Sequence, residues 1–172
     1  LEADAPNLIA SILAAGRDAQ AGRWAGTVDD MDDDYADRCW AMLALGAPSA
    51  QGIDLRIARI NDFIGRDESQ GKQRSALLVA GLAGLGRIDG ATANRLNSRH
   101  GLGLGAKSSW SAMIDAASQR RQAATVAVLA GVGFQASDFR SIPAMHVYHA
   151  VTALSRNGQE FAARMIAAEA LA

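Results

Sequence analysis

Residues 101–108 come closest to a motif with known chemistry. They run GLGLGAKS and nearly match the phosphate-binding pattern G-x-x-x-x-G-K-[ST], but Ala106 stands where the pattern has its second glycine. That loop binds phosphate when a strand leads into it and a helix N-terminus points amide groups at the anion. Ser108 can start such a helix, whereas no strand is expected before Gly101. The residues therefore favour an interhelical loop over nucleotide binding.

Two histidines, His146 and His149, are three residues apart, a spacing that places them on one face of a helix. They could supply two ligands to a metal ion, but zinc sites use at least three protein ligands and no third is evident. His100 lies alone in the glycine-rich segment. We expect the pair to be hydrogen-bonded and partly buried, and we expect no metal and no cofactor.

Aspartates concentrate in residues 29–34, which read DDMDDD. A calcium-binding EF-hand loop needs a glycine at its sixth position and a glutamate at its twelfth. Counted from Asp30, those positions hold Tyr35 and Ala41, so the match fails. The carboxylates instead suit the start of a helix, where they meet the positive end of its dipole.

The chain has one cysteine, Cys39, which cannot form an internal disulfide. Its neighbours on a predicted helix include Trp40 and Leu43, so a buried, inert thiol is expected. The nucleophile-elbow pattern G-x-S-x-G, which would position a catalytic serine, is absent. These features predict a protein that is not an enzyme. The alternative is a small-molecule-binding helical bundle or an enzyme that uses Lys107, His146 or His149, and it requires those side chains to converge in one cleft.

Composition and charge argue against a nucleic-acid-binding protein and against a membrane-spanning one. The 172 residues are 49% hydrophobic, alanine makes up roughly a fifth of them, and 17 basic residues nearly balance 18 acidic ones. A balanced charge gives no general attraction to phosphate backbones, so nucleic acid is not an expected partner. No apolar run is long enough to span a bilayer. We expect a soluble protein, with cytoplasm and periplasm both open.

The chain begins Leu1-Glu2-Ala3-Asp4, without an initiator methionine, a basic n-region or an apolar h-region. We therefore expect it to be cut from a longer protein.

Hydrophobic periodicity predicts helices throughout. The clearest stripe recurs every three to four residues, with charged residues opposite, and consists of Ile53, Ile57, Ile60 and Ile64, with Phe63 beside it. No segment shows the alternation of a half-buried strand. The fold class expected is all-α, in one domain.

Glycines recur where apolar helical segments end, at Gly16, Gly46, Gly86, Gly131 with Gly133, and Gly158. Glycine at such a place supplies the left-handed conformation that ends a helix. These stops are spaced roughly 35 residues apart, close to the period of helix–turn–helix repeats. Complementary helix-start signals are Asp32 or Asp33, Asp89, Ser108 or Ser109, and Ser141 with Pro143. The segment from Asn97 to Gly105 is too rich in glycine for a stable helix, and a division of the domain is placed near residues 97–107.

Two junctions, residues 13–21 and 158–164, resemble tetratricopeptide repeats. In each, a helix ends at glycine and an alanine, Ala21 or Ala163, follows five residues later; Gly86 and Ala91 share that offset. The resemblance implies an α-solenoid of stacked antiparallel hairpins with about eight to ten helices, in which a small residue early in the second helix permits close packing.

Such stacks present concave surfaces that bind other proteins. We therefore expect a non-catalytic protein-interaction or scaffold domain whose partner is a protein or peptide. The residues nominated for partner contact are Gly101, Gly103, Lys107 and Trp110. The main expectation for Trp24, Trp40 and Trp110 is to fill gaps between alanine-rich helices. The sequence specifies neither the partner nor the oligomeric state.

Overall fold

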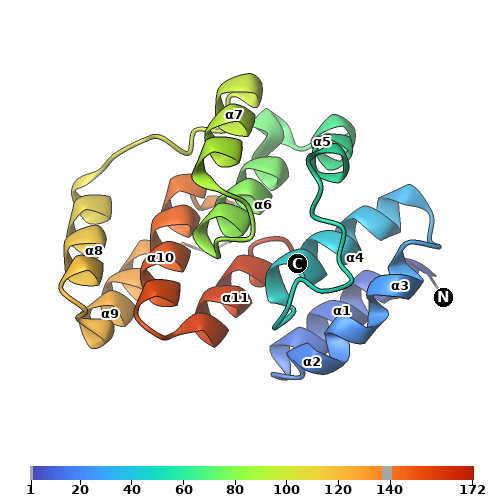
Figure 1. The fold of residues 1–172 in the computed structure, drawn as a ribbon, viewed down its shortest axis with the longest axis horizontal. Coiled ribbons are helices and arrows are strands. Elements are labelled where there is room, and N and C mark those ends of the chain that lie inside the picture. Colours follow the sequence, from blue (N-terminus) through green and yellow to red (C-terminus); the bar gives the residue numbers. More distant parts are fainter. Residues whose placement is uncertain (1, 137–140) are drawn as a thin grey trace.

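The computed structural model describes residues 2–136 and 141–172, and these residues form helices and connecting turns with no strand (Figure 1). The all-α prediction is confirmed. Of the α-helices, α2 and α3 are single turns of four residues. The elements are α1 (Ala5–Ala14), α2 (Asp18–Ala21), α3 (Ala25–Val28), α4 (Asp33–Gly46), α5 (Ile57–Arg66), α6 (Gln73–Gly84), α7 (Gly90–His100), α8 (Ser109–Gln119), α9 (Ala123–Gly133), α10 (Ala144–Arg156) and α11 (Glu160–Glu169). No helix in the described residues is long and apolar enough to cross a membrane.

Helix α10 lies at the centre of the packing. Its most extensive contact is with α6, and it also packs against α8, α9 and α11; α11 in turn packs against α4, and α4 against α1. The pairs α8–α9 and α10–α11 are neighbours in sequence, whereas α6–α10 and α4–α11 join distant segments. Residues of α1, α4, α6, α10 and α11 all belong to one hydrophobic cluster.

Two glycines allow α6 to lie close to its neighbours. A Cβ atom on Gly81 would lie 2.7 Å from Leu45 Cδ2 of α4, and one on Gly84 would lie 2.9 Å from Val151 Cγ1 of α10. Both distances are shorter than a carbon–carbon contact allows. The absence of a side chain at these positions lets the three helices share a core of mostly alanine, leucine and valine.

The predicted glycine stops are confirmed at three junctions. Gly16, Gly86 and Gly158 follow α1, α6 and α10 with φ angles of 70°, 69° and 78°, the left-handed conformation that glycine adopts without strain.

The stops predicted at Gly46 and at Gly131 with Gly133 lie where α4 and α9 end, but neither helix ends through a left-handed glycine. Gly46 is the last residue of α4, and the chain leaves the helix through Ala47 in an extended conformation. A Cβ on Gly46 would lie 2.8 Å from Leu13 Cδ1, so this glycine permits close packing on α1. Gly131 lies inside α9 with open space around it, and α9 continues to Gly133.

The expectation that residues 97–105 are too glycine-rich to be helical needs correction. Residues 97–100 form the last turn of α7, which ends at Gly101 with φ 65°. The glycines lie only beyond that point, and the first side chain after Gly101, Leu102, is buried. The Leu104 amide donates to Asn97 Oδ1 over 3.0 Å, so the segment folds back on the helix that precedes it.

The predictions for the isoleucine stripe and for the alanines that follow the glycine junctions are partly confirmed. Ile60, Phe63 and Ile64 of α5 are buried, but Ile57 in its first turn is 43% exposed. Among the small residues at repeat junctions, Ala21 and Ala163 are fully buried. Ala91 is exposed, so close packing at that junction does not depend on it.

Asp37 of α4 is held by two arginines of α5. Arg59 donates to Asp37 over 2.6 Å and Arg66 over 2.8 and 2.9 Å. The Arg59 guanidinium also lies 4.4 Å from the centre of the Trp40 ring. Burial opposes ionisation of Asp37, but the hydrogen bonds and charges of Arg66 and Arg59 outweigh it, and the pKa of this carboxyl lies below its ordinary value.

Two further arginines meet the C-terminal end of α4. Arg87 donates to the carbonyl oxygens of Ala44 and Ala47, and Arg164 donates to that of Gly46 over 2.6 Å. A helix C-terminus carries unpaired carbonyl groups and partial negative charge, so cations stabilise it. Burial and, to a lesser extent, the charge of Arg164 lower the pKa of Arg87 to about 10.

Candidate functional site

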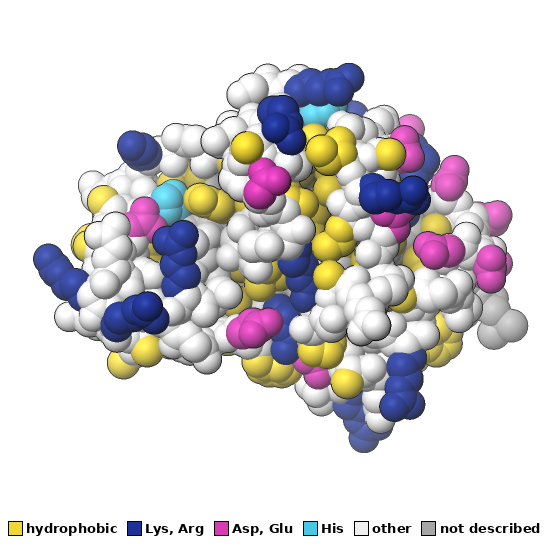
Figure 2. All heavy atoms as spheres, viewed as in Figure 1, with side chains coloured by type: hydrophobic (Ala, Val, Ile, Leu, Met, Phe, Trp, Pro, Cys, Tyr) yellow, Lys and Arg dark blue, Asp and Glu magenta, His cyan; other side chains and the backbone are white. Residues whose placement is uncertain are grey.

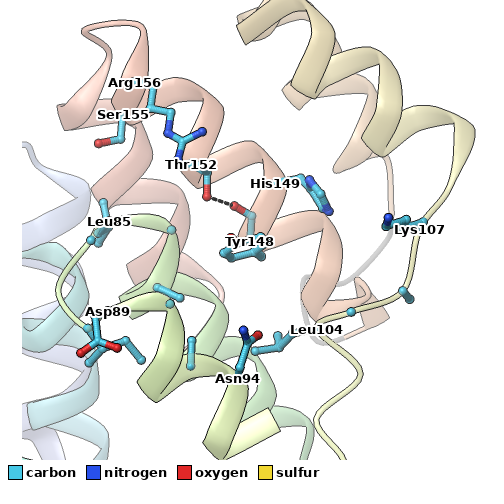
Figure 3. A pocket seen from close by; sticks show the side chains of 18 residues that line it. Leu85, Asp89, Asn94, Leu104, Lys107, Tyr148, His149, Thr152, Ser155 and Arg156 are labelled. Atoms are coloured by element: carbon cyan, nitrogen blue, oxygen red, sulfur yellow. Dashed lines mark hydrogen bonds between the residues drawn. The ribbon is translucent and has the colours of Figure 1, made fainter. Parts of the chain in front are cut away.

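A cleft of about 630 Å³ lies between α10, the α6–α7 turn, the first half of α7 and the segment that precedes α8 (Figure 3). Clefts that hold small molecules measure about 300–1,000 Å³. Its α6 and α7 side includes Leu85, Ile88, Asp89 and Asn94, its α10 side includes Tyr148, His149, Thr152, Ser155 and Arg156, and Leu104 and Lys107 come from the segment before α8.

The α10 side of the cleft is a polar helix face. Its residues follow the spacing i, i+1, i+4, i+7 and i+8 from Tyr148 to Arg156, which keeps them on one side of the helix. The opposite face, with Val147, Val151 and Leu154, is buried in the core. The hydrophobic packing of that face fixes the rotation of α10 and so presents the polar side chains to the cleft.

His149 is oriented from outside the cleft by α8. Its Nδ1 lies 2.9 Å from Asp115 Oδ1. A carboxylate accepts a hydrogen bond, so Nδ1 carries the proton of this pair and Nε2 is the ring nitrogen with no hydrogen-bond partner among residues 2–136 and 141–172.

His146 has different surroundings. Its Nδ1 lies 3.0 Å from the Gly133 carbonyl oxygen, and its ring centre lies 4.3 Å from that of Trp110. The interpretation of His146 and His149 as partly buried, hydrogen-bonded residues is confirmed. They do not face a common centre, because Asp115 holds one ring and the end of α9 holds the other. Within the described residues, no three histidine, cysteine or acidic side chains are placed to hold a metal ion.

Lys107 and Arg156 are the two exposed cations of the cleft. Neither has an ion-pair partner in the part of the chain that the structure describes. The one acid in the lining, Asp89, accepts hydrogen bonds from the Thr92 amide over 2.6 Å and from its hydroxyl over 3.2 Å. The bond from the Thr92 amide lowers the pKa of Asp89 most, and the bond from the Thr92 hydroxyl lowers it further. The ionised Asp89 side chain therefore caps the start of α7.

Of the four residues nominated for partner contact, only Lys107 lines the cleft. Gly101 and Gly103 adopt φ angles of 65° and 71° and shape the turn after α7. Trp110 donates from Nε1 to the Leu129 carbonyl over 2.8 Å, and its indole covers Gly133, where a Cβ would overlap the ring. Trp110 thus joins α8 to α9, and Trp40, which is 2% exposed, fills the core as predicted.

The resemblance of residues 101–108 to a phosphate-binding loop does not extend to its structural setting. Helix α7 precedes Gly101 in place of a strand. Ser108 caps α8, accepting from the Ser111 amide over 3.1 Å while Ser111 Oγ closes the capping box. Of Ser108 and Ser109, the two serines predicted to start this helix, Ser108 is the N-cap. His100 lies in the last turn of α7, with Nε2 3.4 Å from Asn61 Oδ1.

The acidic run lies around the start of α4, where acidic side chains gather in the space-filling view (Figure 2). Asp33 and Asp34 occupy the first turn of that helix, as the helix-dipole interpretation requires. Cys39, further along α4, is completely buried. Burial raises the pKa of its thiol to about 11, which confirms the interpretation of an inert thiol.

A second feature of the surface is the outer face of α9. This helix has no charged residue, and neither do the residues from 122 to 136 that contain it. Val128 is 67% exposed and Val132 50% exposed, and Met113 of the neighbouring α8 is 52% exposed. The exposed positions Ala124, Ala127, Val128, Gly131 and Val132 form one stripe at i, i+3, i+4, i+7 and i+8, and the exposed Thr125 borders it beside Val128 and Val132.

Sequence reasoning missed Tyr148, Thr152, Ser155 and Arg156 as cleft residues. Their signal was present as a polar stripe of helical period beside His149, but it resembles any solvated helix face. Comparison with protein-family models, curated protein sequences and solved structures found no match to this chain. Its function is therefore argued from these two surfaces.

Proposed function

We propose that this chain is a non-catalytic protein-interaction domain and that the outer face of α9 is where a partner protein packs. The single observation that carries the proposal is the uncharged, exposed apolar stripe of α9, which contains Val128 and Val132. Surface helices of a monomer ordinarily place polar or charged residues on their outer side. A contiguous apolar face on an exposed helix is typical of a protein–protein contact.

The spacing of the stripe favours a helix as the partner element. Residues at i, i+3, i+4, i+7 and i+8 form the ridges by which helices pack into one another's grooves. Ala124, Ala127 and Gly131 are small, so a partner backbone can approach closely, while Val128 and Val132 supply apolar area. Complete burial of one valine or methionine side chain contributes about 1.5–3 kcal/mol before the costs of association.

The tetratricopeptide-like arrangement stays a proposal for part of the chain. The hairpins α8–α9 and α10–α11 are consecutive pairs of the kind such repeats contain, and buried Ala163 suits the second hairpin. In a simple solenoid, each repeat contacts only its neighbours, whereas α10 packs most extensively on α6. The proposal of an interaction surface therefore rests on α9 and not on the repeat.

A photo-crosslinking amino acid at position 128 tests the proposal in the protein's own cells. We expect a specific protein adduct at Val128 that disappears when Val132 is also replaced by glutamate. The matched control carries the crosslinker at Leu8 of α1, another exposed apolar position at 44%. Identical adducts at positions 8 and 128, or no protein adduct at 128, would contradict an interface at α9.

Ligand binding is the second candidate function because Lys107 and His149 line one cleft. The sequence alternative was a binding protein or enzyme that uses Lys107, His146 or His149, and of these three His146 does not line the cleft. No catalytic role is proposed for these residues. Their arrangement supports binding, as developed below.

A further inference from the structure

We propose that the cleft between α10 and the α6–α7 turn binds a small, elongated organic dianion. One acidic group of the ligand pairs with Lys107 beside His149, and the other pairs with Arg156. The inference develops the second candidate function and is independent of the α9 face.

The excess positive charge of the cleft favours an anionic ligand. Lys107 and Arg156 are cations without ion-pair partners in the described residues. The Asp89 carboxylate accepts hydrogen bonds from Thr92 and keeps its negative charge, so the two cations outnumber the one acid in the lining. Charge-assisted hydrogen bonds to carboxylate or phosphate are the strongest polar contacts that such side chains make.

The geometry selects a ligand with two separated acidic groups. Arg156 follows His149 by seven residues on α10, which at 1.5 Å per residue places them roughly 10 Å apart along the helix. Figure 3 shows Lys107 and His149 facing each other at the side of the cleft nearest α8, with Arg156 toward the other end of α10. A single phosphate or carboxylate group is too small to reach both places.

The wall opposite α10 favours an apolar ligand body. Leu85 and Ile88 line its α6–α7 side and Leu104 lines the segment before α8, whereas the α10 wall is polar and has Thr152 and Ser155 between the charged ends. The Thr152 hydroxyl donates to the Tyr148 carbonyl over 2.7 Å, so it offers no free donor to a ligand. A hydrocarbon chain with an acid at each end matches this arrangement of apolar wall and terminal cations.

Asp115 is a positioning residue for the site. Its hydrogen bond to His149 Nδ1 fixes the imidazole and leaves Nε2 for the ligand. An Asp115→Asn variant should therefore change the His149 imidazole resonances of the sebacate-bound chain, a signature that a merely structural role for Asp115 would leave unaltered.

Titration calorimetry with sebacate, a ten-carbon dicarboxylate, tests the proposal on the whole chain. Decanoate, which has the same length and one carboxylate, and inorganic phosphate serve as comparison ligands. We expect sebacate to bind roughly tenfold more tightly than decanoate, and phosphate to bind more weakly than either. Lys107→Gln and Arg156→Gln should each weaken sebacate binding roughly tenfold and abolish its advantage over decanoate.

The matched control is Arg120→Gln, which removes an exposed arginine outside the cleft lining and should leave sebacate binding unchanged. The His149 imidazole resonances report occupancy of the cleft directly. Equal affinities for sebacate and decanoate, equal losses in all three variants, or no binding of six- to twelve-carbon dicarboxylates would overturn the proposal. None of these outcomes bears on crosslinking at Val128, so the two proposals fail separately.

Discussion

At the scale of single residues, Asp37 shows how a buried charge is stabilised in this protein. Its carboxylate accepts hydrogen bonds from Arg59 and Arg66, and its side chain is only 10% exposed. Removing one member of a buried ion pair leaves the remaining charge desolvated and unpaired. The stability lost in this way exceeds the stability that the intact pair contributes relative to apolar residues of similar size. The link also fixes α5 beside α4, since both arginines lie on α5.

We predict that Asp37→Asn lowers the free energy of unfolding by about 2–3 kcal/mol at pH 7. The pKa of Asp37 is below the ordinary value of 3.8, so its stabilisation is complete above the pKa of the unfolded chain and is lost as pH falls through the folded value. Urea denaturation at pH 7 and pH 3 measures both effects.

The control for this prediction is Asp62→Asn, an exposed carboxyl of α5, which should change stability by less than about 0.5 kcal/mol. A variant of Asp37 with unchanged stability at pH 7, or with the full loss persisting below pH 3, would contradict the role of its charge.

At the scale of elements, the approach of α8 to α9 depends on one glycine. The Trp110 indole of α8 covers Gly133 at the end of α9 and donates to the Leu129 carbonyl. Two residues earlier, Gly131 faces open space on the same helix. Position 133 therefore has no room for a side chain, whereas position 131 has room for one.

We predict that Gly133→Ala destabilises the protein by about 1–3 kcal/mol, because the new methyl group overlaps the indole ring. Gly131→Ala should be neutral or stabilise by up to about 1 kcal/mol, since alanine has the higher helix propensity. Thermal unfolding of the two variants measures the difference, and an equal response at both positions would rule out the close Trp110 contact.

The elements themselves were largely predictable from sequence, and their ends were partly so. Glycine at Gly16, Gly86 and Gly158 followed apolar segments and took the left-handed conformation that local chain geometry demands. Gly46 and Gly131 carried the same local pattern, yet the first is used for packing against Leu13 and the second faces solvent. Local sequence does not encode what another helix places opposite a glycine, so these two could not be distinguished.

The candidate site was less predictable than the elements. Lys107 and His149 stood out by residue type, but the cleft exists because α10 packs on α6, a contact between segments far apart in sequence. Periodicity indicates which face of α10 is buried, and it contains no information about which helix does the burying. The partnership of His149 with Asp115 depends on the same tertiary arrangement.

At the scale of the whole molecule, Arg164 joins three parts of the chain. From α11 it donates to Asp18 of α2 over 2.6 Å and to the Gly46 carbonyl at the end of α4 over 2.6 Å. Its side chain is 8% exposed. The N-terminal helices are thereby tied to the last helix of the chain.

We predict that Arg164→Met destabilises the whole protein by about 3 kcal/mol, since Asp18 and the Gly46 carbonyl lose their cationic partner. Arg156→Gln, at an exposed arginine without an ion pair, should stay within about 0.5 kcal/mol of the parent chain. Hydrogen exchange in α2, at the end of α4 and in α11 should accelerate together in Arg164→Met. Acceleration in only one of these helices would refute the tie.

The reaction of the buried Cys39 thiol with an alkylating reagent can measure how often α4 becomes exposed to solvent. Cys39 is the one cysteine in the sequence, it has no exposed surface, and its pKa is raised to about 11. Only the thiolate reacts with alkylating reagents, so in the closed protein both access and ionisation suppress the reaction. Alkylation at neutral pH should then proceed at the rate set by transient exposure of α4, and the mass shift of the intact chain would count those events without any introduced label.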